Sequence, residues 1–253
     1  MSSIYTLEIG GKPFGVSVVR GREAVGEPFS FEVFARPEGN NAIAIGGEAT
    51  LAWPLEDGSM RTVTAMVDAF EERGGAGQDT FRQRGATVLN LVPKLSALAD
   101  AAGHRVFVEQ DALEITESIL REYHIRLERR CERSLSKRAQ RVQSFESDLA
   151  FVTRILAKEG ILWFLHPQAA NRVVAVDHPS GFTPIVEERL RVRSPYGFVT
   201  ARSVWDISMA RRAVSDKVTL RDFDLHAPSR CKPRPGKLCR SATNTEVVTL
   251  RLP

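Results

Sequence analysis

The sequence predicts a mainly β protein with helices, an α+β fold. Short stretches rich in β-branched and aromatic residues follow one another over the first ninety residues, separated by Gly-rich or Asp-Gly segments. Helical spacing of apolar residues is confined to the middle of the chain. Hydrophobic residues make up 43% and charged residues 26% of the 253 residues, which is ordinary for a globular protein that can bury a core.

Six strands are predicted in the N-terminal part of the chain. Their apolar residues alternate or run continuously over residues 5–9, 15–19, 29–35, 49–55, 61–70 and 81–91. Asp57-Gly58 is the clearest turn between them, and the run from Gly74 to Gly77 is the most flexible connection. Several short antiparallel strands in this arrangement predict a barrel or a sandwich and not a βαβ sheet.

Between Pro93 and Leu127 the pattern changes to helix. A short helix is predicted around Leu95, Leu98 and Ala99. A second one begins at Asp111, because Glu114 three residues later completes a reciprocal cap. Its apolar face is formed by Ile115, Ile119, Leu120 and Tyr123. Burial of an isoleucine stabilises by roughly 1.5–3 kcal/mol and a cap by about 1 kcal/mol, so packing holds this helix more than capping does.

The stretch from Val142 to Leu165 predicts a complete helix followed by a strand. Ser147 can accept a hydrogen bond from the first turn, and Asp148 places negative charge near the positive end of the helix dipole. Gly160 stands where a left-handed residue closes a helix, and the apolar residues 161–165 then read as a strand. The face to be buried carries Leu149, Phe151, Val152, Ile155 and Leu156. Further strands are predicted at residues 173–176, 189–192 and 218–220.

The net charge of +4 is unevenly placed. The basic cluster consists of Arg121, Arg126, Arg129, Arg130, Arg133, Lys137, Arg138 and Arg141. It can bind phosphate or an acidic partner protein, or it can be a solvated loop and helix face. Base stacking on interleaved aromatic residues would favour nucleic acid, but only Tyr123 lies at the edge of the cluster, so no nucleic-acid partner is expected.

Familiar catalytic and nucleotide-binding motifs are missing from the sequence. It has no phosphate-binding glycine fingerprint, no paired-histidine metalloprotease motif and no G-x-S-x-G elbow. Glu146 and Asp148 can be read as the acid/base pair of a hydrolase, or as carboxylates that satisfy the free N–H groups and dipole of a helix start. His226, Cys231 and Cys239 can be read as three zinc ligands, or as part of a tail with free thiols. No cofactor is expected.

The N-terminus has no basic and apolar segments of a signal peptide, and no apolar run approaches the length of a membrane span. Synthesis in the cytoplasm is therefore expected. Three cysteines, Cys131, Cys231 and Cys239, do not make a paired framework in a chain of this length, so disulfides are not expected to hold the fold.

Ordered patches along the chain resemble a known family. They include Gly21-Arg22-Glu23, Gly47 to Leu51, Glu146-Ser147-Asp148-Leu149, Glu159-Gly160-Ile161 and Val218 to Asp224. Together they look like the VgrG spike proteins of type VI secretion systems, whose fold family includes tailed-phage baseplate hubs and late control protein D. The resemblance spans roughly residues 4–228. The signature positions, taken as structural and not catalytic or metal-binding, are Pro28, Phe29, Arg105, Phe107, Glu146, Ser147, Asp148, Gly160, Arg221 and Asp222.

The resemblance implies two β-barrel units of the baseplate-hub type with intervening helices. It divides the chain into a first barrel unit (1–92), a helical and basic connecting segment (93–141), the signature helix with a second barrel unit (142–228), and an atypical basic tail with Cys and Pro residues (229–253). It also implies a non-enzymatic homotrimer that adapts a sixfold tube to a threefold needle in a contractile injection machine. A tailed-phage baseplate hub is the alternative within the fold family, and a hydrolase using Glu146 and Asp148 the alternative of another class.

The partners implied are a ring-shaped tube protein, baseplate proteins and secreted effectors, with membrane contact only through the assembled machine. The location implied is the cytoplasm during assembly, and the medium or the target cell after contraction.

The chain departs from the family pattern at three places. The family has a tyrosine before the Glu-Ser-Asp triplet, where this chain has Ser144-Phe145, and a glycine in the strand after Arg61, where this chain has residues 65–67. The family also continues into a further barrel and a β-helical needle, so truncation or a changed reading frame is expected for a chain that stops at Pro253. Loss of the needle interface would weaken trimerisation and leave a monomer or a concentration-dependent trimer.

Overall fold

A computed structural model of the protein describes residues 4–37, 42–55, 59–72, 87–167, 169–183, 191–192, 203–204, 206–213, 218–220, 234–236 and 244–251. The chain forms two compact units, Met1–Pro184 and Ile185–Pro253. The first unit contains a β-barrel and a helix–sheet module, and the described part of the second consists of short strands. The predicted class, mainly β with helices, is confirmed.

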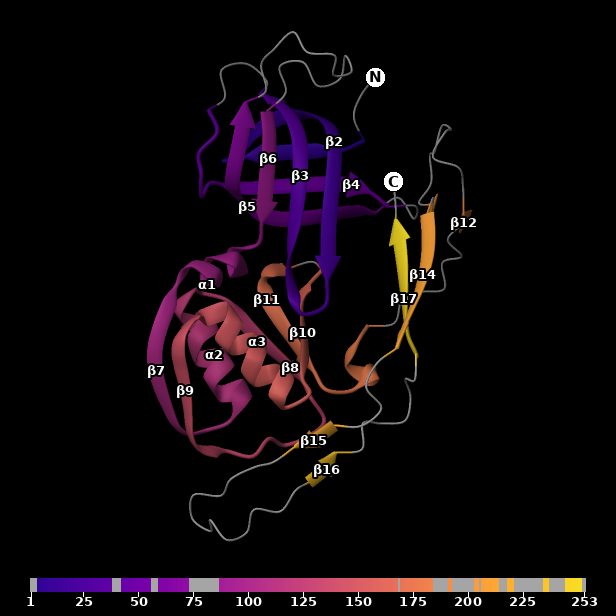
Figure 1. Ribbon diagram of the computed structural model, residues 1–253. Helices are drawn as coiled ribbons and strands as arrows, with labels where there is room; N and C mark the ends of the chain where they lie inside the picture. The colour runs from indigo at the N-terminus through magenta and orange to yellow at the C-terminus, as the bar shows by residue number, and fades with distance from the viewer. Residues whose placement is uncertain are drawn as a thin grey trace. The chain divides into compact units, whose positions relative to one another are not determined.

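The β-barrel is a closed sheet of six strands (Figure 1). The strands are β1 (Thr6–Ile9), β2 (Lys12–Ala24), β3 (Glu27–Pro37), β4 (Glu48–Pro54), β5 (Met60–Glu72) and β6 (Thr87–Val92). They pair in the order β1-β2-β3-β6-β5-β4, and β1 closes the barrel by pairing antiparallel with β4, where Leu7 lies opposite Leu51. Closure leaves no free edge in this sheet.

Alternation of side chains along each strand fills the barrel interior. In β3, Phe31, Val33 and Ala35 are buried, and they share one apolar core with Leu51 of β4 and with Leu89 of β6, the strand that pairs with β3. The strands extend beyond the predicted apolar segments, because outward charged residues continue the pairing; β2, for example, carries Arg20, which lies 3.3 Å from Glu32 of β3. The predicted turn at 57–58, the glycine run at 74–77 and the strand residues 81–86 lie outside the described residues.

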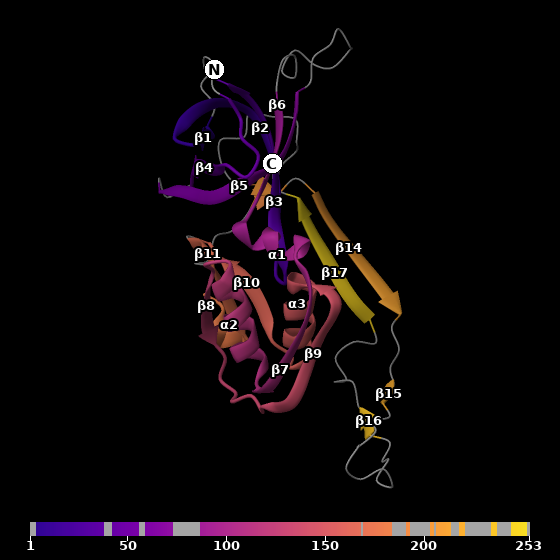
Figure 2. The same cartoon turned by 90° about the vertical axis from the view of Figure 1, so that its left-hand side faces the viewer.

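The helix–sheet module follows the barrel. Its elements are η1 (Lys94–Ser96), α1 (Ala97–Asp100), β7 (Ala102–Gln110), α2 (Ala112–Glu122), β8 (Arg126–Arg130), β9 (Arg138–Ser147), α3 (Asp148–Lys158), β10 (Leu162–His166), β11 (Ala169–Val176) and η2 (Pro179–Gly181). Strands β7 and β9 pair antiparallel as one two-stranded sheet, and β10, β11 and β8 form another sheet in that order. Figure 2 shows the long β7 and β9 strands running side by side past the helices.

The module encloses one apolar core between its two sheets. Buried side chains of α2 and α3 meet those of β10 and β11 there. The members include Ile115, Ile119, Leu120, Phe151, Val152, Ile155, Leu156, Trp163 and Val173. The apolar faces predicted for both helices are therefore the faces that are buried, although Leu149 is only partly buried.

Strands interrupt the stretch between Pro93 and Leu127, for which the sequence pattern had predicted helices only. Strand β7 separates the two predicted helices, β8 follows the second, and β9 begins at Arg138. The period of two in β7 is hidden because Val106 and Val108 point outward while Phe107 points inward, so both faces carry apolar residues. The predicted boundaries of the four parts of the chain stay a prediction.

Both long helices end in the same way, which the sequence predicted for α3 only. Gly160 has φ of 70°, and its N–H donates to Ala157 O at 3.0 Å, while Ile161 N–H donates to Leu156 O at 2.9 Å. This pair of bonds satisfies the last carbonyls of α3. In α2 the left-handed position is taken by His124, with φ of 56°, although a side chain is disfavoured there.

The second unit is described only as strand pairs. They are β12 (Arg191–Val192) with β13 (Ser203–Val204), β14 (Asp206–Ala213) with β17 (Asn244–Arg251), and β15 (Val218–Leu220) with β16 (Arg234–Gly236). Strands β16 and β17 fall within the predicted atypical tail, and β14 had no sequence prediction. Only the first unit contains a closed barrel among the described residues, so the second barrel stays a prediction.

A search of the described helices finds none with the length and apolar character needed to cross a bilayer.

Candidate functional site

The N-terminus of α3 holds a buried carboxylate that is bonded from three directions. The side chain of Asp148 is fully buried. Its Oδ2 accepts from Arg105 Nη2 at 3.0 Å and from the Tyr123 hydroxyl at 2.9 Å, and its Oδ1 accepts from Gln143 Nε2 at 2.7 Å. A buried charge is tolerated when it is paired and hydrogen-bonded in this way. The Asp148 network therefore ties α3 to β7, to the end of α2 and to β9.

Further contacts hold the residues and elements that surround the Asp148 carboxylate. Arg105 also donates to Glu122 at 3.1 Å, which fixes its guanidinium between β7 and α2. Burial, and then the hydrogen bond to Asp148, raise the pKa of Tyr123 to about 12, so its hydroxyl remains a donor at neutral pH. The Phe107 ring stacks on Phe151 of α3 with 5.5 Å between centroids, which holds β7 against the helix.

Ser147 caps α3 as predicted, because its Oγ accepts from Ala150 N at 3.2 Å. Glu146 does not serve the helix start as expected: both of its oxygens bind Arg154, one of them from Nε at 3.0 Å. This bond lowers the pKa of Glu146 below its ordinary value. Glu146 and Asp148 are thus bound to separate sets of partners, and sequence spacing alone could not reveal either set.

Phe145, at the position where the family has tyrosine, lies at the end of β9 with φ of 51° and is 89% exposed. Its ring contacts His104 with 5.4 Å between centroids. The departure from the family pattern therefore affects a surface position, and the buried network beside it is complete.

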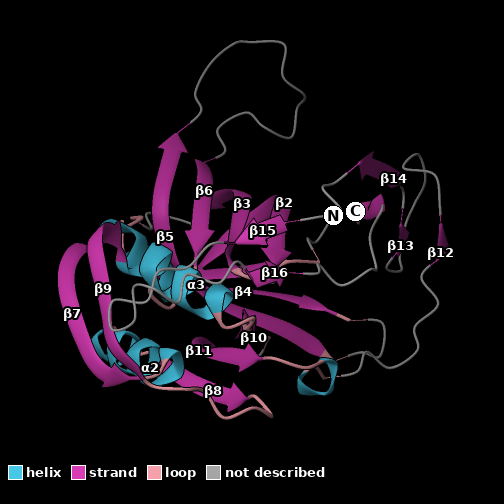
Figure 3. Ribbon diagram, turned by 60° about the horizontal axis from the view of Figure 1, so that its bottom comes forward, coloured by secondary structure: helices cyan, strands magenta, loops and turns pink. Residues whose placement is uncertain are grey.

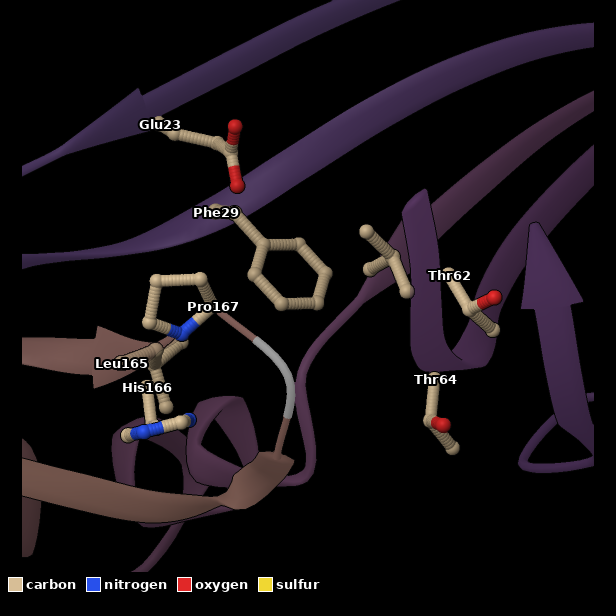
Figure 4. A pocket seen from close by; sticks show the side chains of 8 residues that line it. Glu23, Phe29, Thr62, Thr64, Leu165, His166 and Pro167 are labelled. Atoms are coloured by element: carbon tan, nitrogen blue, oxygen red, sulfur yellow. The ribbon is translucent and has the colours of Figure 1, made fainter. Parts of the chain in front are cut away.

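The signature residues Pro28 and Phe29 lie elsewhere, at the junction of the barrel with the helix–sheet module. Phe29 is buried and faces Leu165 and Pro167 of the module, as Figure 4 shows. A cavity of about 30 Å³ lies beside it, with room for about one water molecule and not for an organic ligand. The Gly26 N–H donates to Trp163 O at 2.7 Å across the same junction. Phe29 thus helps to join the two parts of the first unit, and Pro28 precedes it in β3.

Most of the basic cluster is paired with carboxylates, some from the same helix or strand and some distant in sequence. Seven of its eight members form ion pairs: Arg121 and Arg129 with Glu117, Arg130 with Glu128, Arg133 with Asp177, Lys137 with Glu114, and Arg138 and Arg141 with Glu159. Hydrogen bonds from Arg130 and Arg172 lower the pKa of Glu128. Hydrogen bonds from the backbone N–H groups of Glu132 and Arg133 and from the Arg133 side chain lower the pKa of Asp177. The cluster is therefore a set of ion pairs over most of its length and not a continuous phosphate-binding surface.

Other predicted positions are not brought together with the Asp148 network. Gly160 closes the opposite end of α3. Arg221, Asp222, His226, Cys231 and Cys239 lie outside the described residues. Within the described ranges, no three His, Cys, Asp or Glu side chains are grouped so as to hold a metal ion. Tyr123 and Gln143 were missed as network members, because their hydrogen bonds to Asp148 depend on tertiary contacts.

Comparison with known proteins places this architecture. The sequence model of the phage tail baseplate hub (GPD) family matches residues 22–245. The type VI secretion system spike proteins VgrG1b and VgrG1c of Pseudomonas aeruginosa are 29% and 27% identical to the chain, each over 85% of it. The chain spans only about a third of their length, 30% and 31% respectively.

Solved structures show the same fold. A type VI secretion component of E. coli, described as structurally similar to the T4 bacteriophage tail proteins gp27 and gp5, aligns with a TM-score of 0.63 and 24% identity over 82% of this chain and 56% of its own. A tail protein of Neisseria meningitidis aligns with a TM-score of 0.60 and 13% identity over 85% of this chain and 63% of its own.

The family match ends at residue 245 and not near 228, so it includes β16 and much of the segment that had been predicted to be an atypical tail. The recognition made from the ordered patches is confirmed by both kinds of comparison. The chain belongs to the phage tail baseplate hub (GPD) family.

Proposed function

We propose that the protein is a structural, non-enzymatic hub of a contractile injection machine, the base of a type VI secretion spike. The observation that carries this proposal is the hub-family match over residues 22–245, together with a closed barrel and a helix–sheet module in the matched region. The sequence identity of 29% to the VgrG1b spike protein supports a secretion spike over a phage hub, since the Neisseria meningitidis tail protein compared above is only 13% identical.

In this proposal three copies form a ring that adapts a sixfold tube to a threefold needle. Three chains with two similar barrel units each would present six nearly equivalent positions to the tube. The partners are then a ring-shaped tube protein, baseplate proteins and secreted effectors. The hub would assemble in the cytoplasm and leave it when the machine contracts.

The carboxylates of Glu146 and Asp148 are already bound to other side chains, which argues against the hydrolase alternative. A general acid or base needs access to its substrate. Asp148 is fully buried among three donors, and both oxygens of Glu146 bind Arg154. These contacts suit residues that hold α3 in place.

The hub role is tested by the mass of the full chain in solution. Light scattering over a wide range of concentration should show a species of three times the 28.1 kDa chain mass at the upper end, and this species should bind purified rings of the tube protein. A monomer at every concentration that also ignores the tube rings would contradict the proposal. Reproducible hydrolytic activity of the purified protein that disappears in Glu146→Gln, without loss of stability, would support the enzyme alternative.

A further inference from the structure

A groove runs between strand β9 and helix α3 in the helix–sheet module. It has a volume of about 380 Å³, more than ten times that of the cavity beside Phe29. In Figures 1 and 3, β7 lies on the outer side of β9, and α3 lies on the other side of it. The residues that line the groove are Arg138, Gln140, Arg141, Val142, Phe151, Arg154, Ile155, Lys158 and Glu159.

The groove carries an excess of positive charge. Four of its lining residues are cationic: Arg138, Arg141, Arg154 and Lys158. Glu159 is shared by Arg141 and, at 3.8 Å, by Arg138, while Arg154 is paired with Glu146. Two carboxylates thus pair with three of the four cations. Arg138 and Lys158 are exposed, and their charges are the least compensated by carboxylates. Arg138 lies 3.8 Å from Glu159, and Lys158 makes no close ion pair within the described ranges.

One residue that lines the groove, Arg141, carries a buried donor group. The Arg141 side chain is only 10% exposed, and its Nη2 binds Glu159. Its buried Nε–H has no hydrogen-bond partner among the described residues. An unsatisfied buried donor is costly, and a charged one more so, which makes this site favourable for an incoming acceptor.

Strand β9, which forms one wall of the groove, pairs with β7 alone among the described residues, so its other edge has no strand partner there. The Val142 carbonyl accepts from Arg154 Nη2 at 3.2 Å, so it points away from β7 toward α3. Because backbone groups alternate in direction along an antiparallel pair, the N–H and C=O of Gln140 point to the same edge. This edge can add a further strand.

We propose that the groove between β9 and α3 binds an extended acidic segment of another protein, which adds as a strand to the edge of β9. Edge pairing supplies main-chain hydrogen bonds, and carboxylates at every second position of the segment would lie on one face, toward Arg138 and Lys158. Charge favours a different protein over a second copy of this chain, whose own net charge is +4. The inference does not depend on the hub role.

The test uses fluorescein-labelled peptides and the full chain. The probe TVEVEVT places two glutamates on one face of a strand. We expect its fluorescence anisotropy to rise on binding, and we expect the Gln analogue TVQVQVT to bind at least about tenfold more weakly, since each charge-assisted bond is lost. N-methylation of alternate amides should abolish binding, because it removes the main-chain donors.

Variants of the protein assign the site. The double variant Arg138→Gln/Lys158→Gln should weaken TVEVEVT binding about tenfold, whereas the matched control Arg126→Gln/Lys12→Gln, at exposed positions away from the groove, should leave it unchanged. Circular dichroism checks that both variants fold.

Four outcomes would overturn the inference. Equal weakening by both double variants would show non-specific attraction to a basic protein. Undiminished binding of the N-methylated peptide, or binding of inorganic phosphate without binding of TVEVEVT, would show an anion site and no strand addition. Self-association that the groove variant abolishes would show that a second copy is the occupant. Trimer mass and tube binding are measured without peptide, so failure of the hub role is recorded separately.

Discussion

The barrel and the helix–sheet module of the first unit differ in what holds them together. The barrel interior is apolar and its charges are on the outside, as in the Arg22–Glu27 pair, whose side chains are 73% and 52% exposed. The module has an apolar core of similar composition, but it also buries the Asp148 carboxylate among Arg105, Tyr123 and Gln143.

This difference shows which interactions fix geometry. A closed barrel needs inward apolar residues and a register, both of which tolerate many sequences. Apolar packing alone allows several positions for two helices between two sheets. A buried ionic network with directional hydrogen bonds reduces the number of positions that the helices can take. The recognisable sequence signature accordingly includes Asp148 and Arg105 of the module, while the barrel contributes Pro28 and Phe29 together with its pattern of strands.

The largest effect is expected from removal of the buried carboxylate. Asp148→Ala removes the buried acceptor shared by Arg105, Tyr123 and Gln143, leaves Arg105 with only its pair to the exposed Glu122, and should lower the free energy of unfolding by about 3–5 kcal/mol. The barrel control is Asp68→Ala, since Asp68 is exposed and accepts one bond from Asn90 at 2.9 Å. The Asp68→Ala variant should lower the free energy of unfolding by no more than about 1 kcal/mol. Urea denaturation measures both, and equal losses would remove the distinction between the two regions.

Truncation of core residues should affect the two regions alike. Leu51→Ala in the barrel and Ile155→Ala in the module each remove a fully buried side chain, and each should cost about 2–5 kcal/mol. Hydrogen exchange followed residue by residue reports where protection is lost. A much smaller loss for Ile155→Ala than for Leu51→Ala would mean that the module depends on its polar network more than on its apolar core.

The Glu146–Arg154 pair should contribute a smaller, pH-dependent amount. Its arginine is 39% exposed, so Glu146→Gln should cost only about 1 kcal/mol at pH 7. Because the pKa of Glu146 is lowered in the folded protein, this contribution is complete above the unfolded value of about 4.3 and is lost as the pH falls through the folded value.

Thermal unfolding at pH 7 and at pH 3 measures the pH dependence of this contribution. Glu27→Gln in the barrel is the matched control and should show little effect at either pH, because both members of its pair are exposed. A Glu146→Gln deficit that persists undiminished at the lower pH would show that the loss is not electrostatic.

The smallest effect is a gain in stability at the end of α2. His124 adopts φ of 56°, a region that glycine enters without the Cβ clash. His124→Gly should raise the free energy of unfolding by about 0.5 kcal/mol, as measured by the urea midpoint at unchanged slope. The reverse change at the equivalent position of α3, Gly160→Ala, should lower it. A loss in both variants would indicate that the imidazole makes a stabilising contact.

Local features of the fold could be predicted from sequence. The caps at Asp111 and Ser147, the stop at Gly160 and the apolar faces of α2 and α3 depend on residues within a few positions of one another. The barrel strands could be predicted because one of their faces is buried and the other is solvated.

The candidate site and the groove could not be predicted, because their parts meet only after folding. Arg105 is 43 residues from Asp148, and Arg133 is 44 residues from Asp177, which neutralises it. Strand β7 was missed since apolar residues on both faces hide its alternation. The sequence could not predict the excess charge of the groove, because the carboxylates that pair with most of the basic cluster come largely from other elements.

The pairing order of the barrel has a consequence during protein synthesis. Strand β3 finishes at Pro37, but one of its two neighbours is β6, which ends at Val92. At typical translation rates the ribosome needs about 3 to 11 seconds to make the intervening stretch. During that interval the nascent sheet has an open edge on β3, next to the apolar residues Phe31, Val33 and Ala35. Until β6 leaves the exit tunnel, these residues therefore expose apolar surface of the kind that chaperones bind.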